Sequence, residues 1–391
     1  MSKCTMKNLF WISIMFSFSK PLFAQNLLVT PRRMTTLPKN LKESSGLIVQ
    51  SPNLIWSMND GDNEPALYQV DTLGNLLKTV QIKNQPNIDW EEICLDGQGH
   101  LYIGDFGNND ERRQDLAIYK VLNFNHSGNS VTATRIGFKY EDQTAFPPIA
   151  SKAYFDAEAM LAFSDSIYIF TKDFDTKPYT GSTRIYAIPN REGNHIAKLV
   201  YVLPTDAGWK FYGAVTGAAI SPDKTKVVLL TYGRLFVFSD FSGTAFWKGR
   251  VRKYNILPIL QREGIGFVDN CQLYMTCEKE STNPASLYTL DLCQLLSETE
   301  SNEAKGALIK AYPNPSDSLV TIELSADLKT KDLKLQVADP AGKTIFRKNI
   351  EPNERKIILP SHLFLTNGLY FYAIYSEEED FNFSDKIAIQ K

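Results

Sequence analysis

Acidic residues occupy two recurring positions along the chain, where they could act together on one ligand. The first position opens a short apolar strand and holds Glu91, Glu158 and Glu263, with Glu92 beside the first of them. The second position follows the next strand and holds Asp60, Asp105, Asp173 and Glu278. Carboxylates that face one axis repel each other unless cations or basic side chains compensate their charge. Oxygen-rich clusters of this kind suit Ca²⁺, which takes six to eight oxygen ligands.

Three loops offer oxygen atoms for such a cation: NDGDNE at residues 59–64, GDFGNND at 104–110 and KDFDTK at 172–177. Each places acidic or amide side chains at alternating positions beside a glycine or a turn. We predict that the metal ligands are Asp60, Asp62, Asp105, Asn109 and Asp173. The alternative is that these residues only shape tight turns, where their side chains bond to their own backbone.

Signals for other kinds of chemistry are missing from the sequence. The chain has no G-x-S-x-G elbow, no H-E-x-x-H motif and no glycine-rich dinucleotide fingerprint. Its four histidines give little support to a triad that depends on imidazole. A formal net charge of -2 shows no bias towards nucleic acid, which we do not expect as a partner. Whether the protein is an enzyme stays open at this point, and no catalytic residue is predicted.

Five copies of one strand pattern would position these acids. The copies cover residues 44–60, 91–105, 158–173, 216–233 and 263–278. Each reads as a strand of alternating polarity, a polar turn and a second strand, and a third strand follows. A repeat of roughly 45 residues with four antiparallel strands and no helical period is typical of a β-propeller blade.

We therefore predict an all-β fold, with a five-bladed propeller over residues 26–296. Six blades are the alternative, if an insertion hides a degenerate copy. In a propeller the innermost strands line the axis, and the loops at one end form a shared pocket. The opening segment, residues 26–37, is expected to supply the outer strand of the last blade. Closing the ring in this way avoids exposed sheet edges.

The N-terminus is typical of an export signal. Lys3 and Lys7 precede an apolar run of about ten residues, and a small residue, Ala24, follows. The run is too short to span a bilayer as a stable helix. We predict a signal peptide over residues 1–24 and no transmembrane segment in the mature chain.

Four cysteines follow the predicted signal peptide: Cys94, Cys271, Cys277 and Cys293. Their spacing fits no common zinc pattern. An oxidising compartment permits two disulfides, with three pairings open, and free buried thiols are an equal alternative.

The composition changes near residue 297. Residues 297–306 are polar and charged, and we interpret them as a linker. Short alternating strands follow, which predict a small β-sandwich over residues 307–391.

Four ordered motifs in this last segment resemble the type A C-terminal sorting domain of the type IX secretion system. They are YPNPSDS at 312–318, VADPAGKTI at 337–345, LTNGLYFYAI at 365–374 and KIAIQK at 386–391. The resemblance implies that the type IX secretion machinery is a partner. It also implies a secreted or cell-surface protein that passes through the periplasm.

A second resemblance covers one blade. DWEEICLDGQGHLYIGDFGNNDERRQDLAIYKV at residues 89–121 is similar to a blade motif of phytase-like secreted propellers. The resemblance implies that Asp105 and Asn109 approach a metal. It also implies that Arg112 or Arg113 compensates the acids or holds an anion.

Taken together, these features predict an exported propeller that binds a ligand at its acidic end. The predicted ligand-binding residues are Glu91, Glu92, Glu158, Glu263, Arg112 and Arg113. The ligand is a glycan, a phosphorylated small molecule or a protein. One alternative is a calcium-dependent, phytase-like esterase or phosphoesterase, and another is a structural adhesion module.

Overall fold

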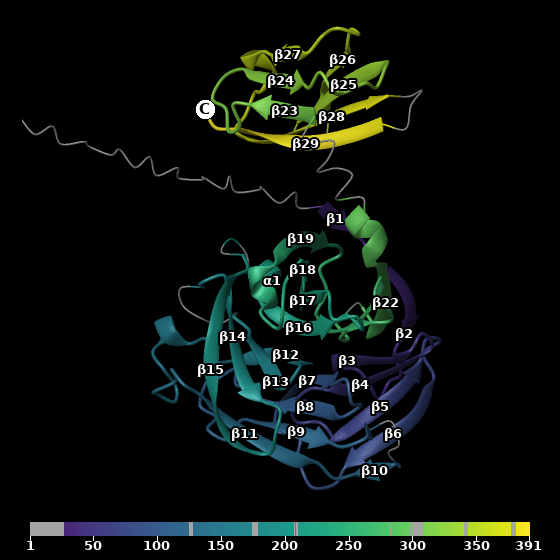
Figure 1. The fold of residues 1–391 in the computed structure, drawn as a ribbon, viewed down its shortest axis with the longest axis vertical. Coiled ribbons are helices and arrows are strands. Elements are labelled where there is room, and N and C mark those ends of the chain that lie inside the picture. Colours follow the sequence, from purple (N-terminus) through teal and green to yellow (C-terminus); the bar gives the residue numbers. More distant parts are fainter. Residues whose placement is uncertain are drawn as a thin grey trace, which may run out of the picture.

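The chain forms two β-rich units, a larger one followed by a smaller one (Figure 1). The structure is a computed structural model. It describes residues 27–391 except 125–127, 174–178, 207, 209, 282, 298, 300–307, 340–342 and 377–380. The predicted signal peptide and most of the predicted linker lie outside the described residues. The prediction of a mostly β protein is confirmed.

The larger unit repeats one antiparallel arrangement of four strands. The first group is β3 (Ser44–Ser51), β4 (Leu54–Asn59), β5 (Ala66–Asp71) and β6 (Leu76–Ile82), with the short β10 (Ser130–Val131) beside β6. The second is β7 (Trp90–Leu95), β8 (Leu101–Asp105), β9 (Ala117–Val121) and β11 (Thr134–Tyr140). The third is β12 (Ala157–Phe163), β13 (Ser166–Thr171), β14 (Ser182–Pro189) and β15 (Gly193–Pro204). Parallel pairing of β11 with β15 joins the second and third groups into one eight-stranded sheet.

Two further groups complete the larger unit. The fourth is β16 (Val215–Ile220), β17 (Val227–Thr231), β18 (Arg234–Ser239) and β19 (Arg250–Ile256), with β1 (Leu27–Val29) parallel to β19. The fifth is β20 (Arg262–Phe267), β21 (Gln272–Cys277), β22 (Ser286–Asp291) and β2 (Arg32–Thr36). Helical segments are short: α1 (Lys210–Gly213), residues 292–297 after β22, and 3-10 turns at Ala150–Lys152 and Phe246–Lys248.

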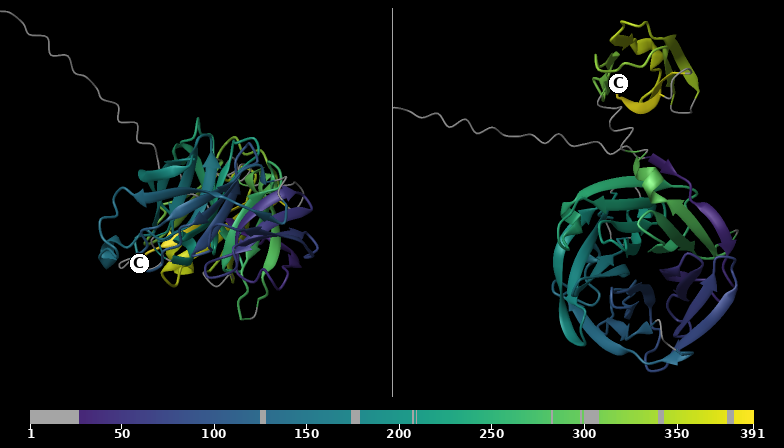
Figure 2. Two further views of the ribbon diagram at one scale, coloured as in Figure 1. Left: turned by 90° about the horizontal axis from the view of Figure 1, so that it is seen from below. Right: turned by 45° about the vertical axis from the view of Figure 1, so that its right-hand side comes forward.

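The innermost strands of the five groups form a closed cycle. β3 lies against β7, β7 against β12, β12 against β16, β16 against β20, and β20 returns to β3. The right-hand view in Figure 2 shows these sheets arranged round a common axis. β2 pairs with β22, so the N-terminal segment forms the outer strand of the last group, as predicted from residues 26–37.

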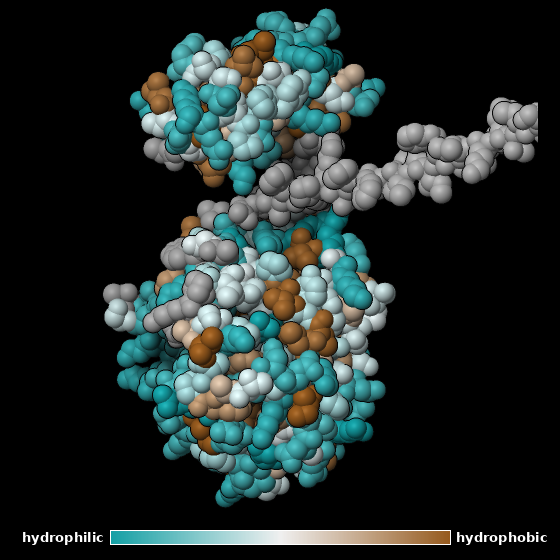
Figure 3. Space-filling model, turned by 90° about the vertical axis from the view of Figure 1, so that its left-hand side faces the viewer, coloured by the Kyte–Doolittle hydropathy of each residue, from teal (hydrophilic) through white to brown (hydrophobic). Residues whose placement is uncertain are grey.

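Apolar side chains fill the interfaces between neighbouring sheets. Ile48, Trp56 and Trp90 pack between the first and second groups, whereas Tyr168 and Phe246 pack between the third and fourth. Burial of these large apolar side chains contributes to the hydrophobic stabilisation of the two interfaces. The visible surface in Figure 3 is correspondingly hydrophilic for the most part, with scattered hydrophobic residues.

The smaller unit contains two antiparallel sheets that share one hydrophobic core. One sheet holds β23 (Ile309–Tyr312), β24 (Val320–Leu324) and β27 (Lys356–Leu359). The other holds β25 (Leu333–Ala338), β26 (Thr344–Asn349), β28 (Gly368–Ser376) and β29 (Phe381–Ile389), and a 3-10 turn lies at Ser361–Leu363. Strict alternation of buried and partly buried residues, as in β24 and β25, is what the period of a half-buried strand requires.

Cysteine pairing is settled for the larger unit. Cys271 and Cys293 form a disulfide, and Cys94 and Cys277 are free thiols. The disulfide joins the turn after β20 to the segment after β22. Among the described residues, no helix has the length and apolar character needed to cross a membrane.

Candidate functional site

Both sets of acids lie at one end of the ring because adjacent strands run in opposite directions. The first residue of β7, Trp90, pairs with the last residue of β8, Asp105. Likewise, β12 begins opposite the end of β13, and β20 begins opposite the end of β21. The starts of the innermost strands and the ends of their neighbours therefore gather at the same end. We call this region the acidic end.

A β-bulge sits at the same place in all five innermost strands. The register shifts occur between Trp90 and Glu92, Ala157 and Ala159, Val215 and Gly217, Arg262 and Gly264, and Ser45 and Leu47. The residues left without a paired partner are Glu91, Glu158, Thr216, Glu263 and Gly46. A bulge re-aims its side chain relative to the regular ladder, and bulges are common beside functional sites. The sequence alignment of the repeats found the three glutamates but not the bulge, and it matched Ser44 where the structure has Gly46.

The second set of acids does not form one ring. The position of Asp105, opposite the first residue of the innermost strand, is taken in the third and fifth groups by Thr171 and Cys277. The following position holds Lys172, Tyr232 and Glu278 in the last three groups. The sequence pattern did not include Lys172 and Tyr232 in this set, because the set was defined by acidic residues.

Lys172 and Glu158 form a buried ion pair. Their side chains are only 10% and 6% exposed. The Lys172 ammonium also lies 5.6 Å from the ring centroid of Tyr232. Burial lowers the pKa of Lys172, but the charges of Glu158, Tyr232 and Glu263 outweigh it, so the pKa is raised well above its usual value.

Glu263 and Glu278 form a carboxyl pair next to this ion pair. The Tyr232 hydroxyl and the Gln261 amide each donate a hydrogen bond of 3.3 Å to Oε1 of Glu263. Burial and then the charge of Glu263 raise the pKa of Glu278 to about 11. Glu278 is therefore protonated at neutral pH and can donate to Glu263. Its Oε1 atom has no hydrogen-bond partner among the described residues.

Two glycines make room for Asp89 and Glu91. A Cβ atom on Gly107 would lie 2.2 Å from Oε1 of Glu91 and 2.5 Å from the Asp89 carboxyl group, and one on Gly61 would lie 2.3 Å from Oδ1 of Asp89. Real Cβ atoms do not approach so closely, so both positions require glycine. The loops after β4 and β8 thus pack directly onto these two carboxyl groups.

Burial also raises the pKa of other acids at this end. The pKa of Asp60 rises to about 7, first because of burial and then because of the charge of Glu263. Burial and the charge of Glu158 raise the pKa of Glu91 well above its usual value. Few basic groups offset these acids, so several of them keep a proton at neutral pH.

Backbone amides hold Glu92. Its two carboxyl oxygens accept hydrogen bonds from the backbone N–H groups of Ile93 at 3.0 Å and Ala218 at 3.2 Å. A Cβ atom on Gly46, whose φ is 67°, would lie 2.8 Å from Glu92 Oε1. Glu92 therefore ties β7 to β16 across the ring, next to β3. This role differs from the ligand contact that the sequence predicted for it, which stays a prediction.

The predicted metal ligands have partners within the protein or face solvent. Asp105 accepts hydrogen bonds from the Tyr119 hydroxyl at 2.7 Å and the Asp89 amide at 3.0 Å, and it pairs with Arg113 at 3.0 Å. Oδ2 of Asp173 accepts from the backbone of Thr180 and Gly181, each at 2.8 Å. Asp62, Asn109 and the neighbouring Arg112 are exposed. Within the described ranges, no group of three or more His, Cys, Asp or Glu side chains could hold a metal ion. The five residues do not fit one calcium cage, and the calcium site stays a prediction.

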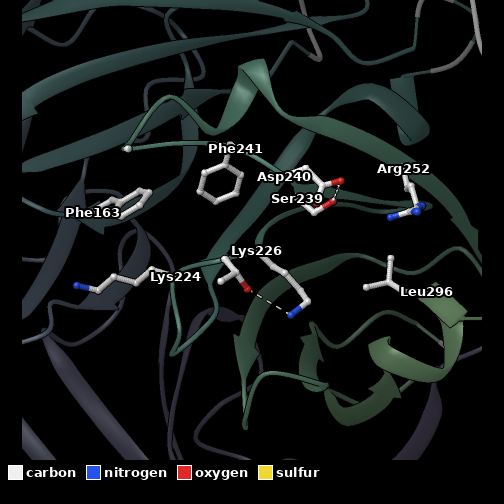
Figure 4. Close-up of a pocket in the computed structure, with 10 residues that line it drawn as sticks. Phe163, Lys224, Lys226, Ser239, Asp240, Phe241, Arg252 and Leu296 are labelled. Carbon is white, nitrogen blue, oxygen red and sulfur yellow. Dashed lines mark hydrogen bonds between the residues drawn. The ribbon is translucent and has the colours of Figure 1, made fainter.

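A separate pocket lies at the other end of the ring (Figure 4). Its lining includes Phe163 at the end of β12, the turn residues Lys224 and Lys226 between β16 and β17, and Arg252 of β19. These positions follow the innermost strands rather than precede them. The pocket therefore belongs to a different surface from the acidic end.

Comparisons with known proteins identify the smaller unit. Residues 310–390 match the family model of the secretion system C-terminal sorting domain, which confirms that part of the predicted resemblance. The match indicates export by the type IX secretion system, to the medium or the cell surface. A search of curated protein sequences finds no match.

Solved structures share only a loose similarity with the chain. The PQQ-bound aldose sugar dehydrogenase of Streptomyces coelicolor is 12% identical at a TM-score of 0.40, over 66% of this chain and 96% of that one. A putative gluconolactonase is 10% identical at a TM-score of 0.37, over 65% and 76% of the two chains. A putative TolB of Agrobacterium tumefaciens is 11% identical at a TM-score of 0.31, over 89% and 91%. Similarities at this level give no information on what this chain binds.

Proposed function

We propose that this cargo of the type IX secretion system is a five-bladed β-propeller that binds a small ligand at its acidic end. In this proposal a signal peptide over residues 1–24 takes the chain to the periplasm, and the C-terminal unit then directs it outward. The closed cycle of five innermost strands supports the blade count.

One observation carries the binding proposal. Five equivalent bulges leave one residue of each innermost strand out of the ladder, and three of the five residues are glutamates buried to at least 95%. Burying so many carboxyl groups is costly in free energy. Stability alone does not require it, because apolar side chains of similar size would avoid the cost. A ligand that donates hydrogen bonds or carries positive charge would offset it.

The charge of the site argues against an anionic substrate. A phosphate group would meet the buried carboxyl groups, and the nearby basic side chains already have acidic partners. Lys172 pairs with Glu158, and Arg113 pairs with Asp105 and Asp115. The geometry therefore supports a binding protein better than a phytase-like phosphoesterase.

Calcium titration of the mature full-length chain tests the site. A ligand of the native state raises the melting temperature by mass action. We expect Ca²⁺ to raise the melting temperature of the wild type and the Glu263→Gln substitution to reduce the rise. Glu192→Gln, on an exposed turn between β14 and β15, is the matched control. The absence of any shift in the wild type would remove calcium from the proposal.

Export is tested separately. Removing residues 310–390 in a bacterium with a type IX system should leave the propeller in the periplasm. Its appearance in the medium would contradict the assignment of the C-terminal unit.

A further inference from the structure

Buried polar atoms without partners gather beside the acidic end, between the second and third strand groups. They are Asn108 Nδ2, Glu111 Oε2, Arg113 Nη2, the Tyr140 hydroxyl and Asp173 Oδ1, none of which has a hydrogen-bond partner among the described residues. The side chains of Asn108, Glu111, Tyr140 and Asp173 are each at least 95% buried. An unpaired buried polar group costs about 1–3 kcal/mol. Several in one place point to an occupant that pairs with them.

Hydrogen bonds connect these residues into one cluster. The backbone N–H of Asn108 donates to Oδ1 of Asp156 at 2.8 Å, and the backbone N–H of Arg113 donates to Oδ1 of Asn108 at 2.9 Å. The amide of Phe155, next to Asp156, donates to Oε1 of Glu111 at 2.9 Å. These bonds fix one oxygen of Asn108 and one of Glu111, and they leave the other polar atom of each side chain unpaired.

Tyr140 and Asp173 lie against the same cluster. The Tyr140 ring centroid is 5.4 Å from that of Phe155, and the charges of Asp156 and Glu111 both act on the Tyr140 hydroxyl. The charge of Asp173 acts on Glu111. Gly107, beside Asn108, touches Glu91, so the cluster adjoins the acidic end.

The mixture of donors and acceptors restricts the occupant. The unpaired amide and guanidinium groups can only donate, whereas an ionised carboxylate oxygen can only accept. Burial raises the pKa of Glu111 to about 7, so at neutral pH its carboxyl group is present in both forms and can accept or donate. A bare cation would be repelled by Arg113, and a bare anion by Asp173. A hydroxyl group both donates and accepts, so it can pair with both kinds of atom. Arg113, whose side chain is 15% exposed, is the member of the cluster that reaches solvent.

We propose that Asn108, Glu111, Arg113, Tyr140 and Asp173 form a subsite for a sugar or other polyol. The inference rests on the proposed function, because it names the chemical class of the ligand at the acidic end. The hydroxyl groups of the ligand bond to the subsite, and the remainder of the ligand lies over Glu91 and its neighbours.

Titration of the mature full-length chain with neutral hexoses and hexitols tests the subsite, with melting temperature and calorimetry as readouts. We expect at least one of these probes to bind saturably. Tyr140→Phe removes one hydroxyl and keeps the ring, and Glu111→Gln converts the free acceptor Oε2 into a donor. Each should weaken binding about 5- to 10-fold, the effect of one hydrogen bond. Tyr372→Phe is the matched control, because it removes a buried hydroxyl without a partner from the C-terminal unit.

Two other outcomes would refute the proposed subsite. Sugar binding that is lost in Glu263→Gln but unchanged in Tyr140→Phe and Glu111→Gln would leave the proposed function intact and refute the subsite. No binding of any sugar or polyol to the wild type would show that the cluster holds internal water only. A rise of the melting temperature with Ca²⁺ that Glu263→Gln reduces would then still support ligand binding at the acidic end. Without ligand, Tyr140→Phe should fold as well as the wild type, since it removes an unpaired buried atom.

Discussion

Replacing Glu278 by glutamine should stabilise the larger unit at neutral pH. Glu278 is 6% exposed and follows β21. Burial and the charges of Glu263 and Asp60 raise its pKa from 4.5 to about 11 in the folded state. Folding at pH 7 therefore forces a proton onto a carboxyl group that is ionised in the unfolded chain. Glutamine avoids this cost, and its amide can still donate to Glu263.

The size of the effect follows from proton linkage. For a group whose pKa is raised on folding, the stability is fully present below the unfolded pKa and is lost as pH rises towards the folded pKa. Each pH unit above the unfolded pKa costs about 1.4 kcal/mol. At pH 7 the wild type should therefore be less stable than Glu278→Gln by about 3 kcal/mol, as long as the folded pKa exceeds 7. Near pH 4.5 the two proteins should be equally stable.

Denaturant unfolding at a series of pH values, followed by tryptophan fluorescence, measures this difference. Every tryptophan after the predicted signal peptide lies between residues 56 and 247, so the signal reports the larger unit alone. Glu280→Gln, on a partly exposed side chain two residues away, should change stability by less than about 0.5 kcal/mol at each pH. A Glu278→Gln protein that is less stable than the wild type at pH 7, or a difference that does not vary with pH, would refute the reasoning.

Three further substitutions have expected outcomes that thermal and denaturant unfolding can check. Gly107→Ala places a methyl group against buried carboxyl groups and should cost about 1–3 kcal/mol, whereas Gly128→Ala, with nothing within 4 Å, should be neutral; equal effects would contradict the packing argument. Joint replacement of Cys271 and Cys293 by serine opens a loop with a sequence separation of 22 and should lower the free energy of unfolding by about 3 kcal/mol. An unchanged denaturation midpoint would argue against the disulfide. Lys172→Met leaves its buried carboxylate partner without a counter-charge and should cost about 3–5 kcal/mol at pH 8, and a loss below about 1 kcal/mol would show that the pair is not buried in solution.

Much of the fold was predictable from strand periodicity. The repeats predicted the five innermost strands, and the need to close the ring predicted that residues 26–37 supply the outer strand of the last sheet. The different partners of the two N-terminal strands were not predicted: β1 pairs with β19 of the fourth group, and only β2 pairs with β22 of the fifth group. Pairing partners depend on distant strands, which a local pattern does not specify.

The site was predictable only in part. Glu91, Glu158 and Glu263 were found because they repeat, and the structure gathers them at one end through equivalent bulges. The sequence aligned Asp105 with the other acids that follow the second strand, but in the structure Asp105 lies at an earlier position than they do. A sequence pattern does not distinguish two registers that differ by one residue. Arg113 was predicted, whereas Glu111 and Tyr140 had no sequence signal because their burial depends on tertiary packing.

Closure of the ring by β2 has a consequence for the order of events during synthesis. Arg33 of β2 pairs with Tyr288 of β22, so a strand made near the start of the larger unit has its partner in the last strand of that unit. Such long-range pairing loses loop-closure entropy before any stabilising contact forms, so it is slow to fold. The larger unit cannot complete its final sheet until nearly 300 residues have emerged, about the length of the chain that precedes the sorting domain. Until then the chain carries two unpaired strand edges, which a holding chaperone could keep from aggregating.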